Sequence, residues 1–189
     1  MIDSVTGVIL TGGKSSRMGK NKALLPYNGK RLMDAPIEIL TRIFSKVILS
    51  VRDPLDYADD ALPQIADQHA GIGPMGGICS VLKSGYRRIF CVACDMPFLN
   101  EALIAHLCGF TEFDAVIPVW EKREEMLHAV YSDSLVPIFE QAILSRRYKL
   151  THVLASARVR YIEQNEIRQF DPFGKSFRNV NTQDDYEKL

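Results

Sequence analysis

Residues 5–22 read VTGVILTGGKSSRMGKNK, and this stretch decides the fold. It joins a short apolar run, Val5 to Leu10, to a glycine-rich turn that basic residues follow. An apolar run without polar alternation is typical of a strand that is buried on both faces of a parallel sheet. Glycines directly after such a strand let backbone N–H groups approach an anion. The stretch therefore predicts an α/β protein with a phosphate-binding turn.

Three further apolar runs have the same continuous character, at Val47 to Val51, Ile89 to Cys94 and Ala115 to Val119. Segments with helical spacing lie between them, at Leu32 to Phe44, Gly76 to Leu82 and Ala102 to Cys108. This alternation predicts a Rossmann-like, doubly wound α/β fold with a mostly parallel central sheet and helices on both faces.

The pattern is looser after Val119. We expect strands at Leu127 to Tyr131 and Val159 to Glu163, and helices at Ser134 to Leu144, Leu150 to Ala155 and Asp184 to Leu189. Pro36 indicates that the helix within Leu32 to Phe44 starts late.

The composition excludes several classes of protein. The 189 residues fit one domain, 1–189. Basic and acidic residues number 23 each, so no net field would draw the chain to nucleic acid or to a membrane surface. No apolar run approaches the roughly 18 residues of a membrane span, and no signal-peptide pattern is seen. We expect a cytoplasmic protein that binds a small ligand.

The turn itself does not match the two best-known phosphate loops. Gly19-Lys20 is followed by Asn21, which breaks the Walker A pattern, and Gly12 and Gly13 are adjacent, unlike the dinucleotide fingerprint. Arg17 and Lys22 supply the charge that would neutralise phosphates. The alternative is a plain tight turn after a strand.

Three motifs carry a more specific resemblance. They are Leu-x-Gly-Gly from Leu10, Ser-x-Arg-Met-Gly from Ser15 and Lys-x-Leu-Leu from Lys22. Together they resemble the opening of the molybdenum cofactor guanylyltransferases, which belong to a wider nucleotidyltransferase group. The resemblance implies that the nucleotide is bound by Leu10, Thr11, Gly12, Gly13 and Lys22, and that Arg17 and Lys22 act in catalysis. The family usually has alanine where this chain has Thr11, and a hydroxyl beside the ligand could alter the base contacts.

Asp95 is the leading candidate for a metal ligand. It follows the apolar run Ile89 to Cys94, and open α/β sheets bind ligands at the carboxyl ends of their strands. Magnesium needs only one or two protein carboxylates beside triphosphate oxygens. The alternative is an aspartate that caps the turn before Pro97. The resemblance adds that Cys-Asp-x-Pro carries the family's Mg²⁺ ligand, and it implies that Asp95 also takes part in nucleotide binding and catalysis. Cys91 and Cys94 also spell C-x-x-C, which we interpret as buried small residues in a strand.

A second glycine-dense loop, from Ala70 to Gly77, suggests a site that is built from two loops. Asp67 stands just before it, and a carboxylate accepts hydrogen bonds well from the amine and ring N–H of guanine. The resemblance places the matching aspartate in the guanine nucleotide site, and places Ser50 where the family has an asparagine. The alternative for Asp67 is a solvated loop acid.

Near the carboxyl end, Asn179 and Asn181 alternate in an extended segment, so their amides would point the same way. The resemblance implies that they bind the acceptor, a pterin or its phosphate. The alternative is that they shape the turn before a terminal helix. His128 lies in a Leu-His-Ala stretch that is similar to a family motif, and it either lines the acceptor side or is a structural histidine.

The resemblance implies a Mg²⁺-dependent enzyme that transfers GMP from GTP to molybdopterin, with transient contact to molybdenum cofactor carriers or apoenzymes. Three alternatives stay open. They are a molybdopterin cytidylyltransferase, a sugar-phosphate nucleotidyltransferase and a non-catalytic molybdopterin carrier. The pair Gly12-Gly13 and Asp67 favour guanine over cytosine.

Overall fold

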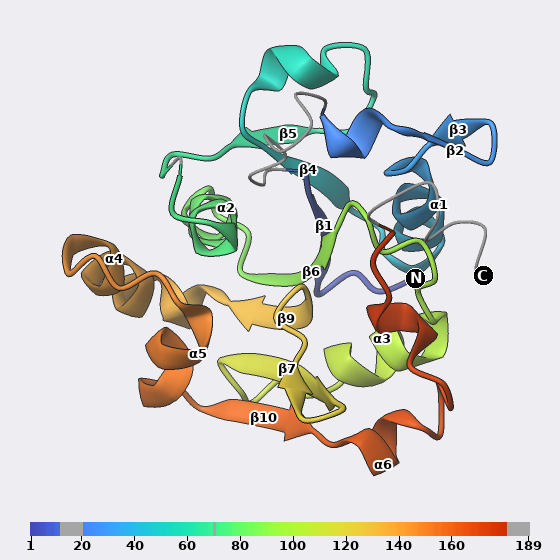
Figure 1. The fold of residues 1–189 in the computed structure, drawn as a ribbon. Helices are drawn as coiled ribbons and strands as arrows, with labels where there is room; N and C mark the ends of the chain where they lie inside the picture. Colours follow the sequence, from blue (N-terminus) through green and yellow to red (C-terminus); the bar gives the residue numbers. More distant parts are fainter. Residues whose placement is uncertain (12–20, 70, 181–189) are drawn as a thin grey trace.

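A computed structural model describes residues 1–11, 21–69 and 71–180. The strands of its central sheet are β1 (Thr6–Leu10), β4 (Val47–Val51), β5 (Gln64–Ala66), β6 (Arg88–Ala93), β7 (Ala115–Trp120), β9 (His128–Ser132) and β10 (Val159–Ile162). They follow the order β10-β7-β9-β6-β1-β4-β5, with β8 (Arg123–Glu124) paired to β7 (Figure 1). A separate two-stranded ribbon joins β2 (Pro26–Tyr27) to β3 (Lys30–Arg31).

Most neighbouring strands are parallel. β1 pairs in parallel with β4 and with β6, as do β4 with β5 and β7 with β10. The expected mostly parallel α/β sheet is therefore confirmed. β9 runs antiparallel to both β6 and β7, and the short β8 runs antiparallel to β7. The first residue of β9, His128, consequently lies opposite Val92, near the end of β6.

Helices cover both faces of the sheet. They are α1 (Asp34–Ile43), α2 (Pro74–Lys83), α3 (Glu101–Cys108), α4 (Val136–Leu144), α5 (Leu150–Val153) and α6 (Gln164–Ile167). Figure 1 shows α1, α3 and α6 on one side of the sheet, and α2, α4 and α5 on the other. Five 3₁₀ helices in the described ranges complete the fold: η2 (Lys22–Leu24), η3 (Pro54–Tyr57), η4 (Asp133–Leu135), η5 (Leu154–Ser156) and η6 (Lys175–Phe177).

The sheet separates two hydrophobic clusters. Ile9 of β1 belongs to the cluster under α1 and α3, and Val8 belongs to the cluster under α2 and α4. Both side chains are fully buried. Burial on both faces is the reason that the strands read as mostly apolar runs, since both faces favour apolar side chains.

The expected elements agree with the observed ones to within a few residues. The strand Val47–Val51 coincides with its expected bounds. The first long helix begins at Asp34, so Pro36 lies in its first turn, where a missing N–H costs nothing. The strand β5 was not expected, because three residues that include a glutamine show no clear period. The expected terminal helix, Asp184 to Leu189, lies outside the described residues.

None of the helices in the described part of the chain combines the length and the apolar content that a membrane span requires.

Candidate functional site

The carboxyl ends of the central strands bring three distant parts of the chain together. Leu10 is paired with Ser50 on one side and with Ala93 on the other. The N–H of Thr11 donates to the carbonyl of Ser50 at 3.0 Å, and the N–H of Cys94 donates to the carbonyl of Leu10 at 3.2 Å. The ends of β1, β4 and β6 are therefore fixed next to one another. This is the edge at which open α/β sheets bind ligands.

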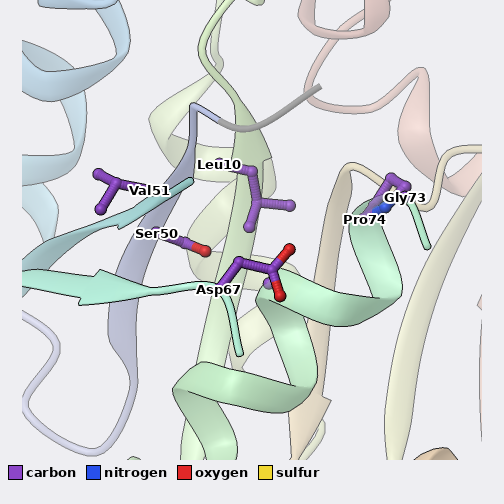
Figure 2. Close-up of a pocket in the computed structure, with 7 residues that line it drawn as sticks. Leu10, Ser50, Val51, Asp67, Gly73 and Pro74 are labelled. Atoms are coloured by element: carbon purple, nitrogen blue, oxygen red, sulfur yellow. The ribbon is translucent and has the colours of Figure 1, made fainter. Parts of the chain in front are cut away.

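A pocket opens at this edge between β1, β4 and α2 (Figure 2). It is lined by Leu10, Ser50, Val51, Asp67, Gly73, Pro74 and Gly77. Figure 2 shows the carboxylate of Asp67 between the side chain of Leu10 and the first turn of α2. Three residues that the sequence predicted for a nucleotide site, Leu10, Ser50 and Asp67, thus share one pocket.

The Asp67 carboxylate is held in place by its neighbours. Its Oδ1 accepts a hydrogen bond from the N–H of His69 at 2.7 Å and a weaker one from the Ser80 hydroxyl at 3.4 Å. A Cβ on Gly76 would lie only 2.8 Å from the same oxygen. Residue 76 must be glycine for the carboxylate to pack against the helix so closely. The result is a fixed acceptor at the pocket wall.

The start of α2 is adapted to this close approach. Gly73, which precedes the helix, has φ 79° and ψ −161°, a conformation that is essentially restricted to glycine. Pro74 then occupies the first turn of the helix, where it has no N–H to lose. The amino terminus of a helix carries a partial positive charge. A Cβ on Gly77 would lie 2.7 Å from the Ser50 hydroxyl oxygen, so this glycine lets the helix lie against β4.

A second cluster at the same edge contains charged groups. Lys22, the first residue of η2, forms an ion pair in which its Nζ donates to Oδ2 of Asp95. The two side chains are largely buried, with exposed fractions of 21% and 13%. Oδ1 of Asp95 is buried and has no hydrogen-bond partner among the described residues. The site therefore brings together a cation and a buried carboxylate oxygen that has no hydrogen-bond partner in the described ranges.

These groups fit a magnesium ion that arrives with a polyphosphate. The unpartnered Asp95 Oδ1 is a hard oxygen donor, which Mg²⁺ prefers. No group of three or more metal-binding side chains occurs in the described ranges. Magnesium can use one or two carboxylates together with phosphate oxygens and water, so a lone aspartate is enough.

The carboxyl-terminal segment reaches the same place. The N–H of Val180 donates to the carbonyl of Asp95 at 2.9 Å. The preceding turn is held by Asp171, whose carboxylate accepts from the N–H groups of Lys175 and Ser176 at 3.0 and 2.7 Å. Asn179 directly precedes Val180 in the chain, so its backbone lies close to Asp95.

His128 is a core residue in this structure. Its side chain is fully buried between the rings of Phe90 and Phe177, with centroid distances of 5.0 and 5.2 Å. Neither ring nitrogen has a hydrogen-bond partner among the described residues. Burial lowers the pKa of His128 to about 3, so the ring is neutral at ordinary pH. This placement favours the structural role over contact with an acceptor.

The C-x-x-C pair has no redox geometry. Cys91 and Cys94 are free, buried cysteines in and after β6. Burial raises the pKa of Cys94 to about 12 and that of Cys91 still further. A thiol with so high a pKa is a poor nucleophile and a poor metal ligand. The interpretation as buried small residues is confirmed.

Gly12, Gly13, Arg17 and Asn181 lie outside the described residues, so their assigned roles stay predictions. Thr11 is explained in part, because its hydroxyl donates to the Ser50 carbonyl at 3.0 Å. The sequence patterns did not indicate Tyr57 or Asn21, which hydrogen-bond each other next to the site. No sequence signal could have found them, since the contact joins residues that are far apart in the chain.

Comparisons with known proteins show which family this chain is similar to. Residues 7–162 match the MobA-like NTP transferase domain. A probable molybdenum cofactor guanylyltransferase of Methanosarcina mazei is 36% identical, over 97% of this chain and 89% of its own length. A molybdenum cofactor guanylyltransferase of Desulfosudis oleivorans is 32% identical, over 99% and 95%. The crystal structure of molybdopterin-guanine dinucleotide biosynthesis protein A from Archaeoglobus fulgidus is similar, with a TM-score of 0.85, 28% identity, and coverage of 97% and 96%.

Proposed function

The chain belongs to the MobA-like NTP transferase family, and we propose that it transfers GMP from GTP to molybdenum-bound molybdopterin. The products are molybdopterin guanine dinucleotide and pyrophosphate. The observation that carries the proposal is the placement of two different groups at one sheet edge. The pocket of Asp67 suits a base, and the neighbouring Lys22–Asp95 pair suits a polyphosphate.

Asp67 supports guanine as the base. A guanine presents a ring N–H and an exocyclic amine side by side, and a carboxylate accepts from both. Cytosine has an exocyclic amine but no ring N–H next to it, so it would use only part of the same acceptor. The fixed position of the Asp67 carboxylate, against the start of α2, would make this preference strong.

The proposed reaction is an in-line displacement at phosphorus. An oxygen of the terminal phosphate of molybdopterin forms a bond to the α-phosphorus of GTP. The bond from that phosphorus to the bridging oxygen breaks, and pyrophosphate leaves with the electron pair. No general base is required, because the phosphate nucleophile is already ionised. Positioning and charge stabilisation supply the acceleration.

The described residues have distinct tasks in this proposal. Lys22 contacts the phosphate chain and stabilises negative charge as pyrophosphate departs. Asp95 would hold Mg²⁺, which would supply Lewis-acid stabilisation of the phosphate charge when bound. Arg17 and the glycine-rich turn are assigned to the phosphates by the sequence alone. Asn179 and Asn181 are proposed for the acceptor, and delivery of the product requires contact with cofactor carriers or apoenzymes.

The proposal is tested with purified protein, Mg²⁺, molybdopterin and each labelled triphosphate in turn. Pyrophosphate release with GTP alone supports guanylyl transfer. Release with CTP instead, or release only when a sugar phosphate replaces molybdopterin, contradicts it. A protein that binds molybdopterin but turns over no triphosphate is a carrier.

The metal assignment has a separate test. Asp95→Asn removes the charge but keeps the size of the side chain. Turnover is expected to fall by about a hundredfold or more, as for other groups that act on transition-state charge, while GTP binding changes little. Asp59→Asn, an exposed site away from the pocket, is the control for loss of one carboxylate. Full turnover by Asp95→Asn would refute the assignment.

A further inference from the structure

The buried hydroxyl of Tyr57 lies between the two residues that flank the glycine-rich stretch. Tyr57 ends η3, in the connection between β4 and β5, and only 3% of it is exposed. The amide of Asn21 donates to the Tyr57 oxygen at 2.9 Å, and the tyrosine hydroxyl lies 3.1 Å from the Asn21 Oδ1 that accepts from it. Burial raises the pKa of Tyr57, and hydrogen bonds with Thr11 and Asn21 partly offset that rise.

Asn21 connects Tyr57 to the ion pair of Lys22 with Asp95. Its Oδ1 also accepts from the N–H of Ala23 at 3.2 Å, and so caps η2. Lys22 is the first residue of that short helix, and its Nζ donates to Asp95. The conformation of Asn21 therefore fixes the backbone position from which the Lys22 side chain extends.

Thr11 is hydrogen-bonded to Ser50, which lines the base pocket. Its hydroxyl and its N–H both donate to the carbonyl of Ser50, each at 3.0 Å. Ser50 lines the pocket together with Asp67. The Tyr57 hydroxyl is thus hydrogen-bonded to Asn21 and lies close enough to the Thr11 side chain for that side chain to affect the pKa of Tyr57.

The segment that carries Tyr57 is anchored independently of its hydroxyl. Gln64 of β5 donates from its Nε2 to the Tyr57 carbonyl at 2.6 Å. Asp60 accepts two hydrogen bonds from Arg31, at 2.8 and 2.7 Å, and its N–H donates to the Tyr57 carbonyl. Removal of the hydroxyl alone should leave this backbone where it is.

We propose that Tyr57 is a positioning residue for nucleotidyl transfer, whose hydroxyl holds Asn21, and through it Lys22, in register with the base pocket. The inference rests on the proposed function and names a residue that this function did not include. A displacement of about 1 Å at a reacting group can lower a rate by about a hundredfold. A small loss of register at Lys22 should therefore lower turnover more than it weakens GTP binding.

The first experiment compares Tyr57→Phe with the wild type in steady-state kinetics, using whichever triphosphate the wild type turns over. The kcat is expected to fall about tenfold, while the KM for the triphosphate changes less than about threefold. Asn21→Ala should reproduce the same pattern, because it removes the other partner of the contact. Tyr131→Phe is the matched control, since it also loses a buried hydroxyl bond, to the Met126 carbonyl at 2.7 Å. It should lower thermal stability but leave kcat unchanged.

The second experiment combines Tyr57→Phe with Lys22→Met. If Tyr57 acts through Lys22, the tyrosine substitution causes no further loss of kcat on the Lys22→Met background. An equal loss on both backgrounds, or unchanged kinetic constants in Tyr57→Phe, overturns the inference. Turnover of a triphosphate other than GTP refutes the proposed substrate. The comparison of Tyr57→Phe on the two backgrounds still tests the role of Tyr57 in that case. A wild type that turns over no triphosphate overturns both proposals.

Discussion

The backbone N–H of Val180 donates to the backbone carbonyl of Asp95 across 2.9 Å. This bond joins the carboxyl-terminal segment to the end of β6, the strand that precedes Asp95. One side-chain oxygen of Asp95 accepts from Lys22, and the other has no hydrogen-bond partner in the described part of the chain. One residue thus links the strand edge, the phosphate-binding lysine and the segment proposed for the acceptor.

The ion pair of Lys22 with Asp95 predicts competition between the ammonium group and a metal ion. In Lys22→Met the carboxylate loses its bound cation, so the nucleotide-free protein should bind Mn²⁺ on the order of tenfold more tightly. Turnover should fall at the same time, because the phosphates lose their lysine. Mn²⁺ titration followed by electron paramagnetic resonance measures the affinity. Lys30→Met, which breaks the exposed pair with Glu38, is the control. Equal Mn²⁺ affinity in Lys22→Met and wild type would contradict the prediction.

Asp67 should set the preference for guanine. In Asp67→Asn one acceptor becomes a donor, so kcat/KM for GTP should fall roughly 10- to 100-fold, the range for an unpaired polar contact. ITP, which lacks the exocyclic amine, sharpens the test. The wild type should prefer GTP over ITP, and Asp67→Asn should lose most of that preference. If the variant keeps the wild-type ratio of GTP to ITP, Asp67 does not contact the base.

The contact between Gly77 and Ser50 predicts a compensating pair of substitutions. The added Cβ in Gly77→Ala would lie 2.7 Å from the Ser50 hydroxyl oxygen, and overpacking of this kind costs about 1–3 kcal/mol. Ser50→Ala removes that oxygen, and the remaining Ser50 Cβ is at an ordinary 3.8 Å. The double variant should therefore recover much of the stability that Gly77→Ala loses in urea unfolding. Additive losses would show that the clash with Ser50 is not the cause.

His128 should make the protein sensitive to acid. Its pKa is about 3 in the folded state, against 6.5 for an unperturbed histidine, because burial disfavours the charged ring. Below pH 6.5 the unfolded chain binds a proton that the folded chain does not, so the free energy of unfolding falls as the pH falls towards 3. Linkage gives a loss of about 2 kcal/mol between pH 7.5 and pH 5.

Urea unfolding at these two pH values measures that loss. His128→Leu, which keeps an uncharged side chain of similar size, should lose about 2 kcal/mol less than the wild type over this interval. The charge of Asp171 raises the pKa of His128, but this effect is smaller than the lowering by burial. His152→Gln is the control, because it replaces an exposed histidine outside the core. An unchanged slope in His128→Leu would show that this histidine does not couple folding to pH.

Local composition was enough to predict the architecture and part of the site. Strands such as Val47–Val51 are buried on both faces, so burial favours apolar residues at nearly every position of the run. Asp95 follows such a run directly, and any residue at the carboxyl end of a parallel strand reaches the same edge of the sheet. The pocket position of Leu10 follows from the same rule, whereas Ser50 and Asp67 were singled out by the resemblance and by the glycine-dense loop after Asp67.

Only the tertiary structure decided the direction of β9, the pairing of Lys22 with Asp95, the contact of Tyr57 with Asn21 and the burial of His128. An apolar run looks the same whether its strand runs parallel or antiparallel, because the side chains alternate in either direction. The two side-chain contacts join residues separated by 73 and 36 positions, so they exist only after the sheet has ordered its strands. His128 lies in the core because β9 is reversed against β6, where it packs beside Phe90.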